Sequence, residues 1–116
     1  MKSAQEVMII VEKLREELQK IYGSRLKEVY LFGSYARGKA DEDSDIDVAV
    51  VLDRISSRFE ERERCSKIRA KLSLDDNCVI NPFFFSENEF KSGKYMLHRN
   101  VAKEGILIWA KKLNYI

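Results

Sequence analysis

The order of hydrophobic patterns along the chain is the feature that most limits its fold. Stretches with strand-like alternation are interleaved with stretches of helical periodicity, in the order helix, strand, turn, strand, helix, strand, helix, helix, strand. This order is typical of a mixed sheet covered by helices, in the α/β or α+β range. We therefore predict a sheet of about four strands packed with helices, and the 116 residues suit a single domain spanning residues 1–116.

The first pattern, residues 3–22, predicts an amphipathic helix. Ser3 and Glu6 have the spacing of a capping box at its start, and Gly23 is placed to end it. The apolar positions recur at intervals of three and four residues and form one face: Val7, Ile10, Val11, Leu14, Leu18 and Ile21.

Four segments predict strands: residues 28–32, 46–52, 78–85 and 106–109. The second has the clearest alternation, which is expected when successive side chains point to opposite faces. Pro82 predicts an edge strand or a bulge in the third. The alternation of the second strand divides it into two faces, Ile46, Val48, Val50 and Leu52 against Asp47, Ala49 and Val51.

The remaining segments predict helices and turns. Residues 57–72 form a polar-rich helix with a weakly apolar side, and residues 75–77 form a turn. Two short helices follow, one opened by Ser86 and Glu89 and the other at residues 95–103. The weakly apolar side of the helix predicted for residues 57–72 consists of Phe59, Cys65, Ile68 and Leu72.

Composition excludes several classes of protein. A net charge of +2 disfavours a nucleic-acid partner, and no apolar run approaches the 18 or so residues of a membrane span. Two cysteines form neither a disulfide framework nor a zinc quartet, and His98, the one histidine, reads as a surface or capping residue. We expect a cytoplasmic protein with reduced thiols, and a homodimer is left open.

Two aspartates at the start of the second strand suggest a metal site. Asp45 and Asp47 are two residues apart, so their side chains point the same way with Cα atoms roughly 6.6 Å apart. Carboxylates about 5 Å apart repel by about 3 kcal/mol at an effective dielectric constant near 20. Hard carboxylate oxygens suit Mg²⁺, which is commonly held by one or two carboxylates together with substrate phosphates.

A Gly-Ser pair follows the first strand directly. Gly33 lets the backbone approach a bulky anion, and the next N–H groups and the Ser34 hydroxyl can donate to phosphate oxygens. Arg37 could reach a phosphate or pair with an acid, and neither is favoured. The segment from Gly33 to Asp47 thus offers phosphate donors at one end and metal ligands at the other, as Mg²⁺-nucleotide chemistry requires.

The pattern GS-x-A-R-G followed by S-D-I-D resembles the signature of the nucleotidyltransferase superfamily that includes DNA polymerase beta. The short chain and its ending LHRNVAKEGILIW resemble the minimal nucleotidyltransferases (MNT), a family with a nucleotidyltransferase-like fold. The resemblance implies that Gly33 and Ser34 bind the triphosphate of ATP or another NTP, and Arg37 is a further candidate for nucleotide binding. It also implies that Asp45 and Asp47 are catalytic and bind two Mg²⁺ ions.

The resemblance further implies transfer of a nucleoside monophosphate, AMP from ATP, to a hydroxyl with release of pyrophosphate. Minimal members are often encoded beside a helical HEPN partner and act as its antitoxin, some by adenylylating it. One alternative is a nucleotide-binding module that neutralises its partner by contact. A weaker alternative is nucleotide addition to RNA or to a small molecule such as an aminoglycoside.

The chain departs from the family at one position. A third carboxylate is expected on the next strand, but residues 79–85 contain none, and Asn81 could offer only an amide oxygen. Two other interpretations of Asp43, Asp45 and Asp47 are a solvated acidic turn and the start of a calcium-binding loop. The calcium loop would lack the glycine and the glutamate that such a loop needs. Asp41, Glu42 and Asp43 read as exposed loop charges.

Overall fold

The computed structural model describes residues 2–112 and has a four-stranded sheet at its centre. The strand order is β3-β2-β1-β4. Strand β2 pairs antiparallel with β1 and parallel with β3, and β1 pairs antiparallel with β4. The predicted mixed sheet is therefore confirmed. Its strands are β1 (Leu26–Phe32), β2 (Ile46–Leu52), β3 (Ile80–Ser86) and β4 (Ile106–Ala110).

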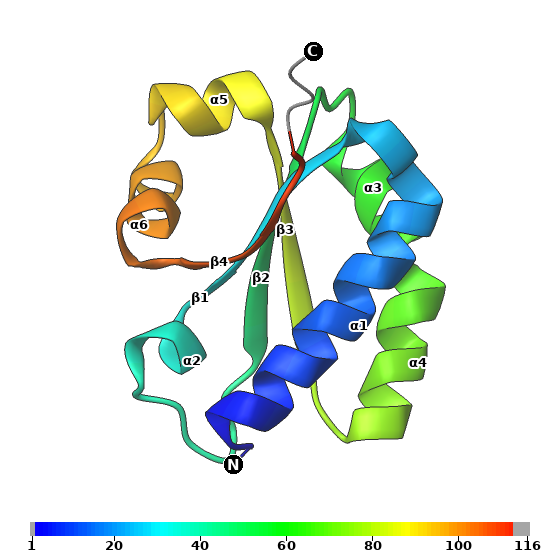
Figure 1. Ribbon diagram of the computed structural model, residues 1–116, viewed down its shortest axis with the longest axis vertical. Coiled ribbons are helices and arrows are strands. Elements are labelled where there is room, and N and C mark those ends of the chain that lie inside the picture. Colours follow the sequence, from blue (N-terminus) through cyan, green and yellow to red (C-terminus); the bar gives the residue numbers. More distant parts are fainter. Residues whose placement is uncertain (1, 113–116) are drawn as a thin grey trace.

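Helices cover both faces of this sheet (Figure 1). One face packs against α1 (Ala4–Tyr22) and α4 (Ser66–Asp76), with α3 (Arg58–Arg64) beside them. The other face packs against α5 (Glu87–Ser92) and α6 (Met96–Glu104). A 3₁₀ turn, Gly23–Arg25, leads from α1 into β1, and the four-residue helix α2 (Ser34–Arg37) follows β1.

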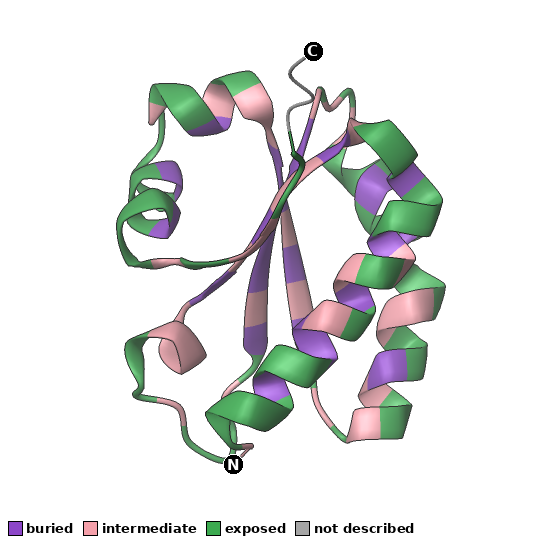
Figure 2. Ribbon diagram, in the orientation of Figure 1, coloured by how far each residue is buried: buried purple, intermediate pink, exposed green. Residues whose placement is uncertain are grey.

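Strand β2 is the most buried element, because both of its faces are covered (Figure 2). Val48 and Val50 pack toward α1 and α4, whereas Ala49 and Val51 pack toward α5 and α6. All four side chains are 0% exposed. The two faces predicted from the alternation of residues 46–52 are confirmed, and the rigid strand fixes the position of Asp47 at its start.

Helix α1 begins and ends where the sequence predicts. Ser3 and Glu6 form the reciprocal capping box, and Gly23 closes the helix with φ +56°. The predicted apolar face is buried except for Ile21, which is 41% exposed. Tyr22 takes its place in the core, since the helix turns the last position toward α3 and the Tyr22 hydroxyl donates to Glu61.

The single helix predicted for residues 57–72 is wrong. The structure has two helices, α3 and α4, interrupted at Cys65, whose φ and ψ of −95° and 0° depart from helical values. Phe59 is 70% exposed, and Glu61 is buried in its place with its carboxylate bonded to Arg64 and Tyr22. The turn predicted at residues 75–77 begins late, because α4 continues to Asp76 and only Asn77 turns, with φ +48°.

Strand β3 is an edge strand, as Pro82 predicts. Its outward carbonyls at Ile80, Pro82 and Phe84 accept hydrogen bonds of 3.0–3.1 Å from arginines of α3 and α4. Pro82 also removes one outward N–H, so this edge offers few free groups to another strand. The three arginines are Arg58, Arg62 and Arg69.

The surface reading of His98 is wrong, whereas its capping role is confirmed. His98 is 3% exposed, and its Nδ1 accepts from the backbone N–H of Tyr95 at the start of α6. The side chain packs edge-on against Phe85. No helix within residues 2–112 is long and apolar enough to cross a bilayer.

Candidate active site

Three strands bring the predicted site residues together at one end of the sheet. Phe32, the last residue of β1, pairs with Asp47 of β2, and Asp47 pairs with Asn81 of β3. Gly33 follows Phe32 directly, so it lies beside Asp47. Neither the antiparallel pairing of β1 with β2 nor the parallel pairing of β2 with β3 could be derived from the motif alone.

Gly33 and Asp47 are in direct contact. Gly33 has φ +75° and ψ −153°, a conformation that is open essentially to glycine alone. A Cβ atom added there would collide with Oδ2 of Asp47. The glycine is thus required by the carboxylate behind it, in addition to any need for close approach to a phosphate.

Ser34 opens the short helix α2, which holds the turn in a fixed shape. The carbonyl of Gly33 accepts from the N–H of Arg37 at 3.1 Å, and the carbonyl of Ser34 accepts from the N–H of Lys39 at 2.9 Å. Gly38 ends the helix in the left-handed region with φ +70°. Ser34 is partly exposed, as a residue that donates to a phosphate must be.

Asp45 is held by Asn81. The Asn81 side-chain amide donates to Oδ2 of Asp45 at 2.9 Å. Asp45 is exposed just ahead of β2, whereas Asp47 is half-buried within it. Both aspartates therefore reach the same end of the sheet as Gly33, as their spacing predicts.

The electrostatic state of Asp47 reflects this crowding. The pKa of the Asp47 carboxyl is raised, chiefly by burial and further by the negative charge of Asp45. The Asn81 amide and the positive charge of Arg37 lower this pKa but do not cancel the rise. A carboxyl whose ionised form is disfavoured by burial and by a neighbouring carboxylate is one that a bound cation would stabilise.

Arg37 forms an ion pair with an acidic residue, which is one of the two roles that the sequence suggests for it. Its guanidinium lies 3.9 Å from the carboxylate of Glu104 at the end of α6. Both side chains are about half exposed, so the pair is weak and Arg37 can still turn toward an anion beside Ser34.

The donor atoms at this end of the sheet fit a hard divalent cation. They are the carboxylate oxygens of Asp45 and Asp47, beside which Asn81 presents the NH₂ end of its amide. Within residues 2–112, no cluster of three or more His, Cys, Asp or Glu side chains is arranged to hold a metal ion. The third carboxylate is therefore missing in space as well as in sequence, and Asn81 stands opposite Asp47 on β3.

The acidic loop before β2 has the predicted exposure. Asp41, Glu42 and Asp43 are all exposed, and the Asp41 carboxylate accepts from the N–H of Asp43 at 2.9 Å. The Ser44 hydroxyl accepts from the N–H of Asp41 and closes the turn. Since Asp47 lies inside β2, these residues do not form a calcium loop.

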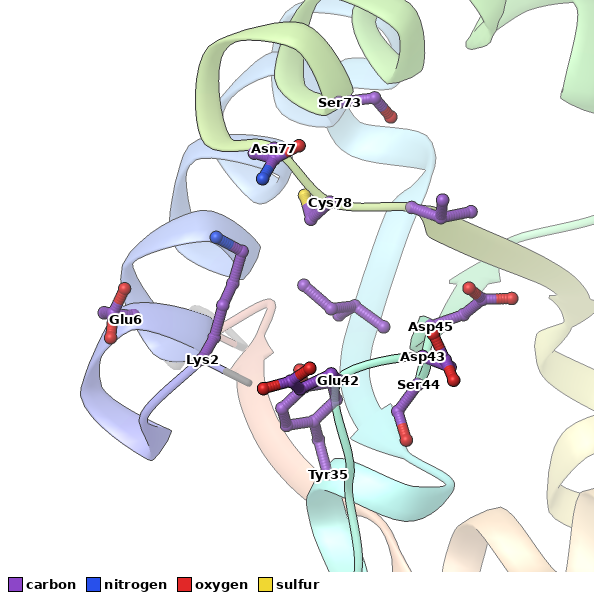
Figure 3. A pocket seen from close by; sticks show the side chains of 12 residues that line it. Lys2, Glu6, Tyr35, Glu42, Asp43, Ser44, Asp45, Ser73, Asn77 and Cys78 are labelled. Atoms are coloured by element: carbon purple, nitrogen blue, oxygen red, sulfur yellow. The ribbon is translucent and has the colours of Figure 1, made fainter.

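A cleft of about 640 Å³ adjoins Asp45 (Figure 3). It does not include Gly33, Ser34 or Asp47. No sequence signal identified the cleft, because its walls come from four separate segments. The residues that line it are Lys2, Glu6, Tyr35, Glu42, Asp43, Ser44, Asp45, Ile46, Ser73, Asn77, Cys78 and Val79.

The fold and this end of the sheet define an enzyme of the nucleotidyl-transferring class. The model of the nucleotidyltransferase domain family matches residues 11–108, and the chain belongs to that family. A relative named protein adenylyltransferase MntA, from Thermococcus cleftensis, is 36% identical over 80 residues, which are 69% of this chain and 79% of the relative.

Solved structures share the fold. A candidate nucleotidyltransferase of Sulfolobus solfataricus has a TM-score of 0.67 at 24% identity and covers 100% of this chain and 95% of its own. A chain from the complex of the tri-AMPylated HEPN toxin of Shewanella oneidensis with its MNT antitoxin has a TM-score of 0.56 at 20% identity, covering 90% of this chain and 73% of its own.

Proposed function

We propose that this chain is a single-domain, Mg²⁺-dependent adenylyltransferase of the cytoplasm that moves AMP from ATP to a hydroxyl on a helical HEPN-type protein. The contact of Gly33 with Asp47, at the sheet end shared with Asp45 and Asn81, carries the proposal. It places the Gly-Ser turn beside two carboxylates, which suits a triphosphate and its metal ions.

The chemistry of the proposed reaction follows from this arrangement. The backbone N–H groups after Gly33 and the hydroxyl of Ser34 would hold the β- and γ-phosphates, with Arg37 adding charge. Asp45 and Asp47 would hold Mg²⁺, which when bound neutralises phosphate charge and aligns the groups. The acceptor oxygen attacks the α-phosphorus, the bond to the bridging oxygen breaks, pyrophosphate leaves, and the acceptor proton passes to water.

The cleft beside Asp45 is the space from which the acceptor would approach. Asp45 lines the cleft, whereas Gly33 and Ser34 do not, so an acceptor in the cleft could reach the phosphorus without displacing the Gly-Ser turn. An in-line displacement needs the attacking and leaving groups on opposite sides of the phosphorus. The charged lining of the cleft is mainly acidic, with Glu6, Glu42 and Asp43 against Lys2. Such a lining disfavours a nucleic-acid acceptor and is compatible with a protein segment.

Two relatives support the choice of acceptor. The Thermococcus cleftensis relative is named a protein adenylyltransferase, and the Shewanella oneidensis complex pairs an MNT antitoxin with an AMPylated HEPN toxin. A second function remains in view because Asn81 replaces the third carboxylate. In that alternative, the chain binds nucleotide and neutralises its partner by contact without transfer.

The deciding experiment incubates the chain and a HEPN-type partner encoded beside it with ATP labelled in the α-phosphate. We expect label on the partner with the wild type and none with Asp45→Asn or Asp47→Asn. Glu63→Gln, which removes an exposed charge on α3 outside the cleft, is the matched control and should transfer normally. Inhibition of the partner by all three variants without any label would favour the contact mechanism.

A second variant tests the acceptor path alone. Val79 lines the cleft and is 52% exposed, and its backbone carbonyl accepts from Ile46. Val79→Trp should fill the cleft without touching the Gly-Ser turn. We expect transfer to fall about tenfold while Mg-ATP binding is retained; unchanged transfer would place the acceptor elsewhere.

A further inference from the structure

We propose that Asn81 is a positioning residue that makes divalent-metal binding depend on bound nucleotide. The inference rests on the proposed function, because the nucleotide in question is the ATP assigned to the Gly33–Asp47 site. It goes beyond that function by assigning an order of binding: the metal ion is retained only when phosphates supply part of its coordination shell.

The first observation is the hydrogen bond that Asn81 makes. Only the NH₂ end of an amide side chain can donate to a carboxylate, so the 2.9 Å contact with Oδ2 of Asp45 fixes which way the amide faces. One of the four carboxylate oxygens of the pair is thereby occupied by an N–H. Asn81 also pairs with Asp47 in the register of β2 and β3, so it is the neighbour of both aspartates.

The second observation is that each carboxylate is held from a different side. Asp47 packs against the bare Cα of Gly33, and Asp45 is tied to Asn81 on β3. The Asn81 bond is the one side-chain hydrogen bond that the described part of the chain gives to the Asp45 carboxylate. Without it, an exposed side chain ahead of β2 would sample several rotamers.

These observations together limit the charge available to a metal ion. Two carboxylates with one oxygen occupied attract a divalent cation less than the three carboxylates expected for the family. Affinity for such ions is tuned by the number of charged ligands, and Mg²⁺ gives up its waters reluctantly. The pair is therefore ordered for a metal ion yet too weak to retain one until the phosphates complete the shell.

The test measures Mn²⁺ binding from the free-ion electron paramagnetic resonance signal, with and without the non-hydrolysable analogue AMP-PNP. We expect the wild type to bind Mn²⁺ at least about tenfold more tightly with the analogue. Asn81→Asp should raise Mn²⁺ affinity without the analogue by about tenfold or more. Asn77→Asp is the matched control, since Asn77 lines the neighbouring cleft and gains the same charge away from the pair.

Asn81→Ala provides a second, independent readout. It adds no charge but releases Asp45, so Mn²⁺ affinity with AMP-PNP should fall about fivefold while the circular dichroism spectrum is unchanged. Wild-type Mn²⁺ binding that is equally tight with and without AMP-PNP would overturn the inference. So would an Asn81→Asp variant that gains no more than Asn77→Asp. Failure of the wild type to bind AMP-PNP under any condition would instead overturn the proposed function.

Discussion

Replacing Gly33 with alanine should lower both the stability of the protein and its affinity for Mg-ATP. The loss of stability can be worked out from the structure. The backbone at φ +75° and ψ −153° is strained for any residue with a Cβ, by about 1–3 kcal/mol. The new methyl group also collides with Oδ2 of Asp47, and overpacking of this kind costs about 1–3 kcal/mol more. We expect a loss of about 3 kcal/mol in unfolding free energy.

Gly38→Ala is the matched control for backbone strain. Gly38 also has a positive φ, +70°, but a Cβ there meets nothing within 4 Å. A left-handed alanine costs about 1–2 kcal/mol, so this variant should lose only that much stability. Because no atom near Asp47 moves, its affinity for Mg-ATP should stay within about twofold of the wild type.

Urea unfolding and calorimetric titration with Mg-ATP measure the two effects separately. In the Gly33→Ala protein, the Asp47 carboxylate must shift away from the new methyl group. We therefore expect Mg-ATP affinity to fall about tenfold, which corresponds to about 1.4 kcal/mol. Equal affinities in the Gly33→Ala and Gly38→Ala proteins would refute the claim that Gly33 positions Asp47 for nucleotide binding.

Three further predictions concern the rest of the fold. Burial, aided by Arg58 and Arg99 and opposed by Glu89, lowers the pKa of His98. The unfolded chain therefore binds more protons than the folded one, and wild-type stability should fall as the pH drops below about 6.5. In urea unfolding at pH 7.5 and 5.0, the His98→Gln protein should lose less stability over this range than the wild type, and an equal loss would contradict the assignment. Glu61→Gln should lower the unfolding free energy by about 1–3 kcal/mol in the same assay, because it weakens the hydrogen bonds to Tyr22 and Arg64. The exposed control Glu60→Gln should change it by less than about 0.5 kcal/mol, and similar losses in the two variants would argue against a buried network. A thiol reagent should label Cys78, which is partly exposed, well before Cys65, which is 0% exposed and whose pKa burial raises, and equal rates in the native protein would be inconsistent with this packing.

The sequence predicts most of this fold because its local signals agree with its tertiary structure. The capping box at Ser3 and Glu6 and the alternation of residues 46–52 appear in the structure as predicted. The break at Cys65 could not be foreseen, since neither proline nor glycine marks it. It follows from tertiary contacts, with Glu61 turned inward to Tyr22 while α4 runs beside α1.

The candidate site could be predicted in its residues but not in its contacts. Spacing alone places Asp45 and Asp47 on one side of a strand, and a Gly-Ser pair after a strand suggests a phosphate turn. The collision between a Cβ at Gly33 and Asp47 depends on the pairing of β1 with β2. The bond from Asn81 to Asp45 depends on the parallel register of β3, which no local pattern encodes.

The central claim is that the Gly33–Asp47 segment binds a magnesium nucleotide. Calorimetric titration of the wild type, the Asp45→Asn Asp47→Asn double variant and the Glu63→Gln control with Mg-ATP tests it most directly. We expect saturable binding by the wild type and the control, and binding by the double variant weakened at least about tenfold. Absence of binding by the wild type, or undiminished binding by the double variant, would contradict the claim.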